Sequence, residues 1–471
     1  MMLIVVICLL LVSSPFLLRL WIRRRSKKLL PHLRKNQKGE RTAVVGFFHP
    51  YCNAGGGGER VLWTAIRALQ NKYPRIQCVV YTGDIEASGT EILQKAVQRF
   101  NISVKPVEFI FLHRRSMVEA SSYPYFTLLG QSLGSIVLGW EAMMKFVPDV
   151  YIDTMGYAFT MPLFKFLAGV STMSYVHYPT ISTDMLQKVA DRTQAHNNAS
   201  FISQSAILSW GKLQYYKMFA WLYGVMGRRS DKIFVNSTWT FNHIKQLWKA
   251  ADTTFIIYPP CDVTEFRKIP LTKSKPSKTI ISIAQFRPEK DHQLQIRSFY
   301  KFLNCQIHKD YKLLLVGSCR NEGDSKRVRE LQLLCNKLNL EENVEFKLNV
   351  SFEDLKKLMS TSAIGLHTMW NEHFGIGVVE LMAAGTIILA HNSGGPKLDI
   401  VTDFNGQKTG YLADSEESYA AAMNTVFKLS DDERFVIRQN ARQSVERFGE
   451  DEFEKGFLTI GEQIMEKALL L

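Results

Sequence analysis

The sequence predicts an α/β protein with two domains, each built on a parallel β-sheet that helices cover on both faces. From residue 41 onward, short apolar runs of strand length alternate with segments of helical periodicity. One polar segment with two prolines, residues 269–278, separates two such series and is predicted to be a linker. In such proteins ligands bind at the carboxyl ends of the strands. The functional residues are therefore expected in loops that follow strands.

The positive charge of the chain is concentrated near its N-terminus. The formal net charge is +14, and the segment from Arg19 to Arg41 contains ten Lys or Arg residues and one acidic residue. This segment carries +9 of the +14, which leaves +5 for the other residues. No DNA- or RNA-binding motif accompanies the charge, so no nucleic-acid partner is expected. A basic segment after an apolar stretch is typical of the flank of a membrane anchor.

The apolar stretch from Met2 to Ile22 is long enough to span a bilayer, which needs about 20 residues. We predict a transmembrane anchor helix over residues 1–22 and a basic juxtamembrane segment over 23–40. A cleaved signal peptide is the alternative, but the basic residues follow the apolar run and no clear cleavage site follows it. Positive charge on the C-terminal side of the anchor predicts that the large domains lie in the cytosol.

The cysteines and the possible glycosylation sites agree with a cytosolic location. The chain has seven cysteines, an odd number without a C-x-x-C pair, which predicts free thiols and no zinc site. Four tripeptides match the N-glycosylation pattern and begin at Asn101, Asn198, Asn236 and Asn349. In a cytosolic protein they are expected to stay unmodified.

The first domain, residues 41–268, opens with a strand at 42–48, the glycines Gly55 to Gly58, and a helix at 59–72. Four glycines allow the backbone to approach a ligand directly before a helix N-terminus, although a tight turn also uses glycine. The loop matches neither the dinucleotide-binding motif nor the P-loop. Further strands are predicted at 78–82, 107–111, 150–153, 173–176 and 232–235.

Two other features of this domain have alternative interpretations. Residues 123–169 are rich in aromatic and aliphatic side chains, yet no run is long enough for a second membrane span. Buried helices explain them, and a surface that enters the lipid headgroups is the alternative, favoured by Trp, Lys and Arg residues at 210–229. His177 follows a predicted strand, where a lone histidine is usually structural and a role in a site is the alternative.

The second domain, residues 279–445, repeats the pattern of strands and helices. Strands are predicted at 279–284, 312–316, 344–346 and 363–367, and helices from 292, at 325–338 and at 352–359. Arg287 and Lys290 follow the first of these strands. Two fixed cations in this position can hold a diphosphate, although such pairs are often solvated surface residues.

Residues 371–385 are the most informative stretch. Glu372 is predicted to lie in a loop and Glu380 in a helix that begins after Gly375 and ends at Gly385. A helix that is entered through glycine presents unpaired N–H groups and the positive end of its dipole. Both favour a phosphate or a diphosphate at this helix N-terminus.

These motifs resemble those of the retaining family 4 glycosyltransferases, which have the GT-B fold of two facing Rossmann-like domains. The shared features are Glu372 and Glu380 with seven residues between them, the Phe374-Gly375-Ile376 opening, the Arg287 and Lys290 pair and the glycine loop after the first strand. Longer motifs at 49–63, 128–135, 175–182 and 285–290 are similar to the eukaryotic GDP-mannose:dolichol-linked oligosaccharide α-1,2-mannosyltransferases.

The resemblance implies that the first domain holds the lipid-linked acceptor, that the second holds the nucleotide sugar, and that a C-terminal helix over 446–471 crosses back to the first domain. Glu372 would contact the donor sugar and Glu380 the ribose. The implied catalytic residues are Glu372, His177, Arg287 and Lys290, with His177 on the donor mannose and the two cations on the departing GDP. The implied donor-binding residues are Gly57, Gly58, Arg287, Lys290, Phe374, Gly375, Ile376 and Glu380.

The implied reaction is the transfer of the fourth and fifth mannoses, with retention, from GDP-mannose to a dolichol-diphosphate oligosaccharide in N-glycan precursor assembly. It would take place on the cytosolic face of the endoplasmic reticulum membrane, where other mannosyltransferases are possible partners. No cofactor and no metal are expected, because the chain lacks a D-x-D motif. Two alternatives are an enzyme of the same fold that transfers N-acetylglucosamine from its UDP derivative to phosphatidylinositol, and a non-catalytic membrane scaffold.

Overall fold

A computed structural model of the chain describes residues 17–26, 28–35, 38–185, 206–273 and 277–470. Its contacts divide the chain into two compact units: the first runs to Ile257 and includes Glu454–Leu471, and the second comprises Tyr258–Phe453 together with Ser237–Trp239. Residues 258–268, which the sequence analysis assigned to the first domain, therefore pack in the second unit. The reason is that the short helix α9 (Val263–Arg267) buries apolar side chains in the core of that unit.

The first unit contains a seven-stranded parallel sheet of order β3-β2-β1-β4-β5-β6-β7. All six predicted strands are confirmed, and β7 was not predicted. The strands are β1 Ala43–Phe48, β2 Ile76–Thr82, β3 Glu108–Phe111, β4 Val150–Asp153, β5 Ser171–Val176, β6 Lys232–Val235 and β7 Thr254–Ile256. Strand order reverses at the neighbours β1 and β4, so the loops after these two strands form the topological switch point, where doubly wound sheets bind ligands.

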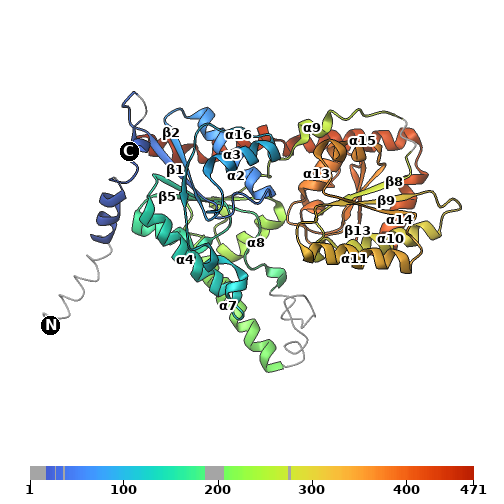
Figure 1. The fold of residues 1–471 in the computed structure, drawn as a ribbon, viewed down its shortest axis with the longest axis horizontal. Helices are drawn as coiled ribbons and strands as arrows, with labels where there is room; N and C mark the ends of the chain where they lie inside the picture. The colour runs from blue at the N-terminus through green and yellow to red at the C-terminus, as the bar shows by residue number, and fades with distance from the viewer. Residues whose placement is uncertain (1–16, 27, 36–37, 186–205, 274–276, 471) are drawn as a thin grey trace. The chain divides into compact units, whose positions relative to one another are not determined.

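Helices pack on both faces of this sheet (Figure 1). They are α2 Gly57–Lys72, α3 Gly89–Phe100, α4 Thr127–Lys145, α7 Ala206–Gly227, α8 Thr238–Trp248 and α16 Glu450–Leu470. The last helix lies beside α2, because Glu454 and Glu462 form ion pairs with Arg67 and Lys72, both at 2.7 Å. The C-terminal helix is thus part of the first unit from Glu454 onward.

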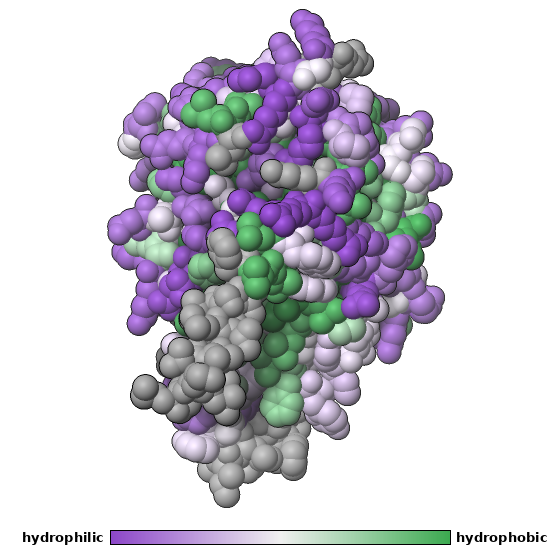
Figure 2. All heavy atoms as spheres, turned by 90° about the vertical axis from the view of Figure 1, so that its left-hand side faces the viewer, coloured by the Kyte–Doolittle hydropathy of each residue, from purple (hydrophilic) through white to green (hydrophobic). Residues whose placement is uncertain are grey.

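The apolar segments of the first unit are only partly buried. Helix α4 buries Leu138, Ala142 and Met143 in the core, as the buried-helix interpretation predicts. Other large apolar side chains are exposed, and Figure 2 shows hydrophobic side chains gathered in one area of the face that it displays. The exposed ones include Leu17, Trp21, Tyr125, Phe126, Leu133, Phe166, Trp210, Met218 and Trp221.

The predicted membrane anchor falls mostly outside the described residues. Residues 17–26 are helical, and residues 2–16 of the apolar stretch lie outside the ranges given above. Within those ranges, no helix is both long enough and apolar enough to cross a bilayer.

The second unit contains a six-stranded parallel sheet of order β10-β9-β8-β11-β12-β13. The four predicted strands are confirmed as β8 to β11, whereas β12 and β13 were not predicted. The strands are β8 Thr279–Ile283, β9 Lys312–Gly317, β10 Val344–Leu348, β11 Ile364–Leu366, β12 Ile387–His391 and β13 Gly410–Ala413.

Two apolar cores lie on opposite faces of this sheet, and helices cover both faces (Figure 1). Helices α10, α11 and α14 contribute to one core, α9, α12 and α13 contribute to the other, and α15 contributes to both. The helices not yet delimited are α10 His292–Asn304, α11 Glu322–Lys337, α12 Phe352–Thr361, α13 Ile376–Ala383, α14 Glu416–Lys428 and α15 Asp431–Ser444. The three predicted helices are confirmed. Helix α13 stops where expected, because Gly385 follows its cap with φ +81°, a left-handed conformation that glycine favours.

Candidate active site

Glu372 lies in a loop and is held by two basic side chains of the second unit. Its Oε2 atom lies 2.5 Å from Lys290 Nζ and 3.1 Å from His367 Nε2. A carboxylate only accepts hydrogen bonds, so His367 Nε2 carries the proton and donates it. We call Lys290, His367 and Glu372 the glutamate cluster. It lies at the carboxyl ends of β8 and β11, which are parallel neighbours in the sheet.

The cluster keeps Glu372 ionised. Burial opposes the charge, but the hydrogen bond from His367 and the positive charge of Lys290 outweigh it and hold the pKa of Glu372 well below its usual value. The side chain of Glu372 is 15% exposed and that of Lys290 is 23% exposed. The two charges therefore meet in a partly dry environment, where their attraction is stronger than on the open surface.

Thr368 connects the loops that carry Lys290 and Glu372. Its hydroxyl group lies within hydrogen-bond distance of two backbone carbonyls, Lys290 O at 2.9 Å and Asp291 O at 3.1 Å, and it accepts from Gln295 Nε2 at 2.9 Å. Lys290 itself ends a single 3₁₀ turn, Pro288–Lys290, and Asp291 then caps α10. These contacts fix the position of Lys290 relative to the β11 loop.

A second turn, Ser393-Gly394-Gly395, supports the loop that carries Glu372. Ser393 Oγ accepts from Asn371 N at 2.7 Å, and Gly395 N donates to Glu372 O at 2.8 Å. A side chain has no room here, since a Cβ on Gly395 would lie 2.4 Å from Phe374 O. The backbone of Glu372 is thus enclosed by its neighbours before any ligand binds.

The other predicted residues of the second unit lie near this loop but differ in their exposure and in their contacts. Arg287 is 46% exposed, and its nearest acid is Glu289 at 3.8 Å. The side chain of Phe374 is buried against Tyr258 and Phe448, so its ring belongs to the core. Gly375, with φ +117°, is the N-cap of α13.

Ile376 and Glu380 both belong to α13. Ile376 is its first residue, so its N–H group has no acceptor within the helix. Glu380 stands one turn further on and is half-buried. The N-terminus of α13 thus follows Glu372 directly and offers N–H groups to an anion.

In the first unit, the structure brings Gly58 and His177 together. Gly57 and Gly58 are the first residues of α2, so their N–H groups have no acceptor within the helix. A Cβ on Gly58 would lie 3.3 Å from His177 Nε2. The preceding amides of Ala54 and Gly55 are already bonded to the Glu59 carboxylate, at 2.5 and 2.7 Å. Glu59 thereby shapes the glycine loop.

His177 belongs to a polar group at the switch point of the first sheet. His177 Nε2 donates to Thr154 O at 3.1 Å, and His49 Nδ1 lies 2.7 Å from Thr154 Oγ1. Burial and the neighbouring charge of His177 lower the pKa of His49 to about 3. Asp153, just before Thr154, is fully buried, and burial raises its pKa to about 7. The pKa of His49 is thus displaced downward and that of Asp153 upward, and in each case burial favours the neutral form.

Within the described ranges, no three His, Cys, Asp or Glu side chains lie close enough to hold a metal ion. The charged side chains of the glutamate cluster are instead paired with one another. The chemistry that these residues offer is binding of an anion by fixed cations and amides, beside a carboxylate that stays charged.

Comparison with known proteins decides the family. Residues 42–248 match the model described as ALG11 mannosyltransferase N-terminus, and residues 263–444 match glycosyl transferases group 1. The chain is 56% identical to the mouse GDP-Man:Man(3)GlcNAc(2)-PP-Dol alpha-1,2-mannosyltransferase, over 98% of this chain and 94% of the relative. The chain belongs to the ALG11 mannosyltransferase family. The human relative of that name is 55% identical, over 97% of this chain and 94% of the relative.

More distant ALG11 relatives and solved structures agree with this placement. The Dictyostelium discoideum enzyme of the same name is 46% identical over 90% of this chain and 85% of its own. Among solved structures, sucrose-phosphate synthase of Thermosynechococcus elongatus has a TM-score of 0.64, with 15% identity over 90% of this chain and all of its own. Anabaena HepE with UDP and glucose has a TM-score of 0.58, with 19% identity over 91% and 99%. These structural matches show the fold alone, two parallel α/β domains of the GT-B type.

His367, Thr368 and Glu59 were not predicted as site residues. His367 had a usable signal, because it ends a predicted strand and so lies at the edge where ligands bind. Thr368 and Glu59 gave no such signal, since the contacts that give them a role, with Lys290 O, Asp291 O and Gln295 for Thr368 and with the Ala54 and Gly55 amides for Glu59, form only in the folded chain.

The buried His292, next to the glutamate cluster, predicts a pH dependence of stability. Burial and the charge of Lys290 lower its pKa from 6.5 to about 4. The folded state thus binds fewer protons than the unfolded state, so stability is complete above pH 6.5 and is lost as the pH falls towards 4. We expect His292 to account for about 2 kcal/mol of the loss in unfolding free energy between pH 7.5 and 5.

The measurement compares denaturant unfolding of wild type and His292→Gln at both pH values. Glutamine cannot gain a proton, so the variant is expected to lose less stability on acidification, whatever its stability at pH 7.5. Equal losses in the two proteins would contradict the assignment of this pH dependence to His292.

Proposed function

We propose that the chain is a retaining α-1,2-mannosyltransferase that adds the fourth and fifth mannoses, from GDP-mannose, to a dolichol-diphosphate-linked oligosaccharide. The main support for this proposal is that the chain is 56% identical, over nearly its whole length, to a relative whose name states a Man(3)GlcNAc(2)-PP-Dol acceptor and a GDP-mannose donor. The glutamate cluster and the open α13 N-terminus support this proposal, since a nucleotide sugar needs cations and amides for its diphosphate.

In the proposed reaction, Arg287, Lys290 and the amides of Gly375 and Ile376 bind the diphosphate. Glu380 hydrogen-bonds the ribose. No metal ion takes part. Of the two cations, Arg287 is the more exposed, so it meets the ligand without breaking a buried ion pair. Lys290 must share its charge between Glu372 and the departing GDP.

Retention follows if the acceptor hydroxyl attacks mannose from the side that the diphosphate leaves. The bond from C1 to the phosphate oxygen breaks, the bond from C1 to the acceptor oxygen forms, and the acceptor proton passes to the phosphate oxygen. Glu372 then stabilises positive charge on the sugar, and His177 with the Gly57 and Gly58 amides contacts the donor. A double displacement through Glu372 is the alternative, but two hydrogen-bond donors already hold one carboxylate oxygen and reduce its nucleophilicity.

The Arg287→Ala variant is expected to lower turnover about 100-fold, because a fixed charge that stabilises a leaving group contributes that much. Folding should be unaffected, since the side chain is exposed. Mannose transfer and the far-ultraviolet circular dichroism spectrum are measured together. Arg297→Ala, an exposed position on α10, is the matched control. Near-normal transfer by Arg287→Ala would remove Arg287 from the phosphate site.

The protein is also proposed to reside in the endoplasmic reticulum membrane, anchored by residues 1–22 with both units in the cytosol. The basic segment after the apolar stretch and the exposed Trp21, Trp210 and Trp221 of the first unit support a membrane location. In intact microsomes, added protease should digest both units, and endoglycosidase should leave the mobility of the chain unchanged. Protection from protease would place the units in the lumen instead.

One assay tests the activity and its alternatives. Membranes that contain the protein are incubated with GDP-mannose and a Man3GlcNAc2-diphosphodolichol acceptor, and the expected product is two hexoses larger and sensitive to α-mannosidase. A product only from UDP-N-acetylglucosamine and phosphatidylinositol would support the other enzyme. No product from either donor would support the scaffold.

A further inference from the structure

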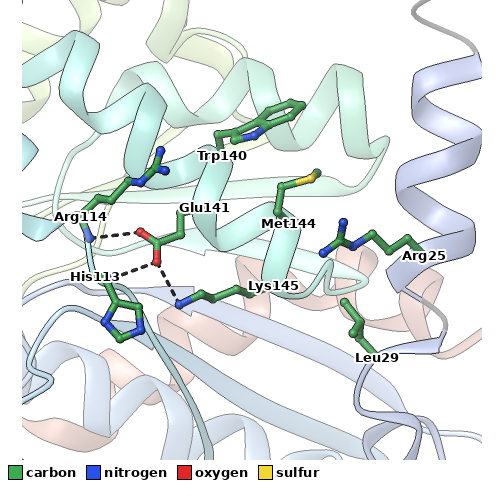
Figure 3. Close-up of a pocket in the computed structure, with 8 residues that line it drawn as sticks. All are labelled: Arg25, Leu29, His113, Arg114, Trp140, Glu141, Met144 and Lys145. Carbon is green, nitrogen blue, oxygen red and sulfur yellow. Dashed lines mark hydrogen bonds and ion pairs between the residues drawn. The ribbon is translucent and has the colours of Figure 1, made fainter.

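The first unit has a second candidate ligand site, a cavity of about 670 Å³ (Figure 3). Gly57, Gly58 and His177 do not line it. Three segments form it: the region just after the N-terminal apolar stretch, the turn that follows β3, and the last turns of α4. The lining residues are Arg25, Leu29, His113, Arg114, Trp140, Glu141, Met144 and Lys145.

Only part of the charge in this cavity is balanced. Glu141 forms an ion pair with Lys145 at 2.9 Å and accepts the N–H groups of His113 and Arg114 at 2.9 and 3.1 Å. Lys145 also donates to Phe111 O. In the part of the chain that the structure describes, no acid forms an ion pair with Arg25 or Arg114. With His113 neutral, three cations and one carboxylate leave a formal charge of +2.

The two guanidinium groups come from different segments and lie on opposite sides of the cavity, with Trp140 and Met144 between them (Figure 3). Guanidinium groups bind phosphate oxygens through paired hydrogen bonds. A diphosphate esterified at both ends carries two negative charges, one on each phosphate, which matches two separated guanidiniums. The phosphodiester of a common phospholipid carries one.

The place of the cavity along the chain fits a lipid-linked ligand. Arg25 belongs to the helix at residues 17–26 and lies three residues beyond Ile22, the end of the apolar stretch, or about 4.5 Å along a helix axis. If that stretch is in the bilayer, the cavity lies at the level of the headgroups. Leu29, Trp140 and Met144 then offer apolar surface to the first carbons of a polyprenyl chain.

We propose that this cavity binds the diphosphate of the polyprenyl-linked acceptor, with Arg25 and Arg114 on its two phosphates. The proposal rests on the proposed function for the identity of the acceptor. Several sugars separate the diphosphate of such an acceptor from the mannose that is extended. A diphosphate site that is separate from the donor-binding residues is therefore what this substrate requires.

The test uses the full-length protein in detergent and the double variant Arg25→Gln, Arg114→Gln. Arg24→Gln is the matched control, because Arg24 is an exposed neighbour that does not line the cavity. Both altered side chains of the double variant are exposed, so folding should not change. The expected result is a KM for the diphosphodolichol acceptor raised tenfold or more, with the KM for GDP-mannose unchanged. An unchanged acceptor KM, or an equal rise for both substrates, would overturn the proposal.

A binding measurement makes the test independent of mannose transfer. Farnesyl diphosphate is titrated into wild type and variants, and farnesol and inorganic diphosphate serve as the two halves of that probe. The double variant should lose at least tenfold in affinity for farnesyl diphosphate and keep its affinity for farnesol. Equal losses for farnesyl diphosphate and farnesol would overturn the diphosphate assignment. If the wild type transferred no mannose but this binding loss occurred, the proposed function would fail while the lipid diphosphate site remained.

A third arm distinguishes the acceptor from the bilayer. Vesicles of phosphatidylcholine with and without phosphatidylinositol are floated with wild type and the double variant. Equal flotation of the two proteins supports the acceptor site. Loss of binding to phosphatidylinositol vesicles, with farnesyl diphosphate affinity unchanged, would show a site for phospholipid headgroups and overturn the proposal.

Discussion

The Lys290→Met variant is expected to lose about 1,000-fold in turnover. Lys290 is proposed to bind the leaving diphosphate, and a fixed charge of that kind contributes about 10²–10³-fold. Lys290 also lies 2.5 Å from Glu372 Oε2, so its loss leaves a carboxylate that is 15% exposed with His367 as the remaining donor of the cluster. Both effects act on the reacting part of the donor, so kcat should fall more than the KM for GDP-mannose rises.

The matched control is Lys301→Met on α10. The side chain of Lys301 is 41% exposed and forms ion pairs with Glu416 and Glu417, so turnover should stay near the wild-type value. Mannose transfer at saturating donor and acceptor is the measurement, with circular dichroism to verify folding. Turnover of Lys290→Met within tenfold of wild type would contradict both the diphosphate contact and the positioning of Glu372.

The Gly395→Ala variant is expected to lose about 100-fold in turnover without any change in a polar side chain. The new Cβ would lie 2.4 Å from Phe374 O and 2.5 Å from Phe374 Cα, and backbone atoms cannot rotate away. The φ of Gly395 is −60°, so alanine meets no conformational strain and the effect is purely steric. The loop that carries Glu372 must therefore move, and a shift of about 1 Å near the reacting groups costs about 10²-fold.

Overpacking of this kind also costs about 1–3 kcal/mol of stability. Thermal unfolding and transfer assays of Gly395→Ala are compared with those of Gly211→Ala, where the added Cβ meets nothing within 4 Å. We expect both a lower Tm and a lower turnover for the first variant and neither for the second. A stable, fully active Gly395→Ala protein would show that this turn does not control the position of Glu372.

Local sequence patterns were sufficient for most of the fold. The apolar runs predicted ten strands that the structure contains, because buried strands of parallel sheets are continuously apolar. The three missed strands are β7, β12 and β13, of which β7 and β13 are three and four residues long and lie at sheet edges, where the pattern is short. The boundary near residue 258 was missed because the linker was predicted from prolines and polar residues. These residue types do not indicate which core α9 packs into.

For the candidate site, the sequence alone determined which residue types follow which strands. It placed Glu372 in a loop, opened α13 after Gly375 and put Arg287 and Lys290 after β8. Only the tertiary structure decided which of them meet. Lys290 pairs with Glu372, 82 residues away, because β8 and β11 are neighbours in the sheet and their following loops share one edge. Strand order depends on long-range packing that no local pattern specifies, and so the pairing of Lys290 and the place of His367 appeared only with the fold.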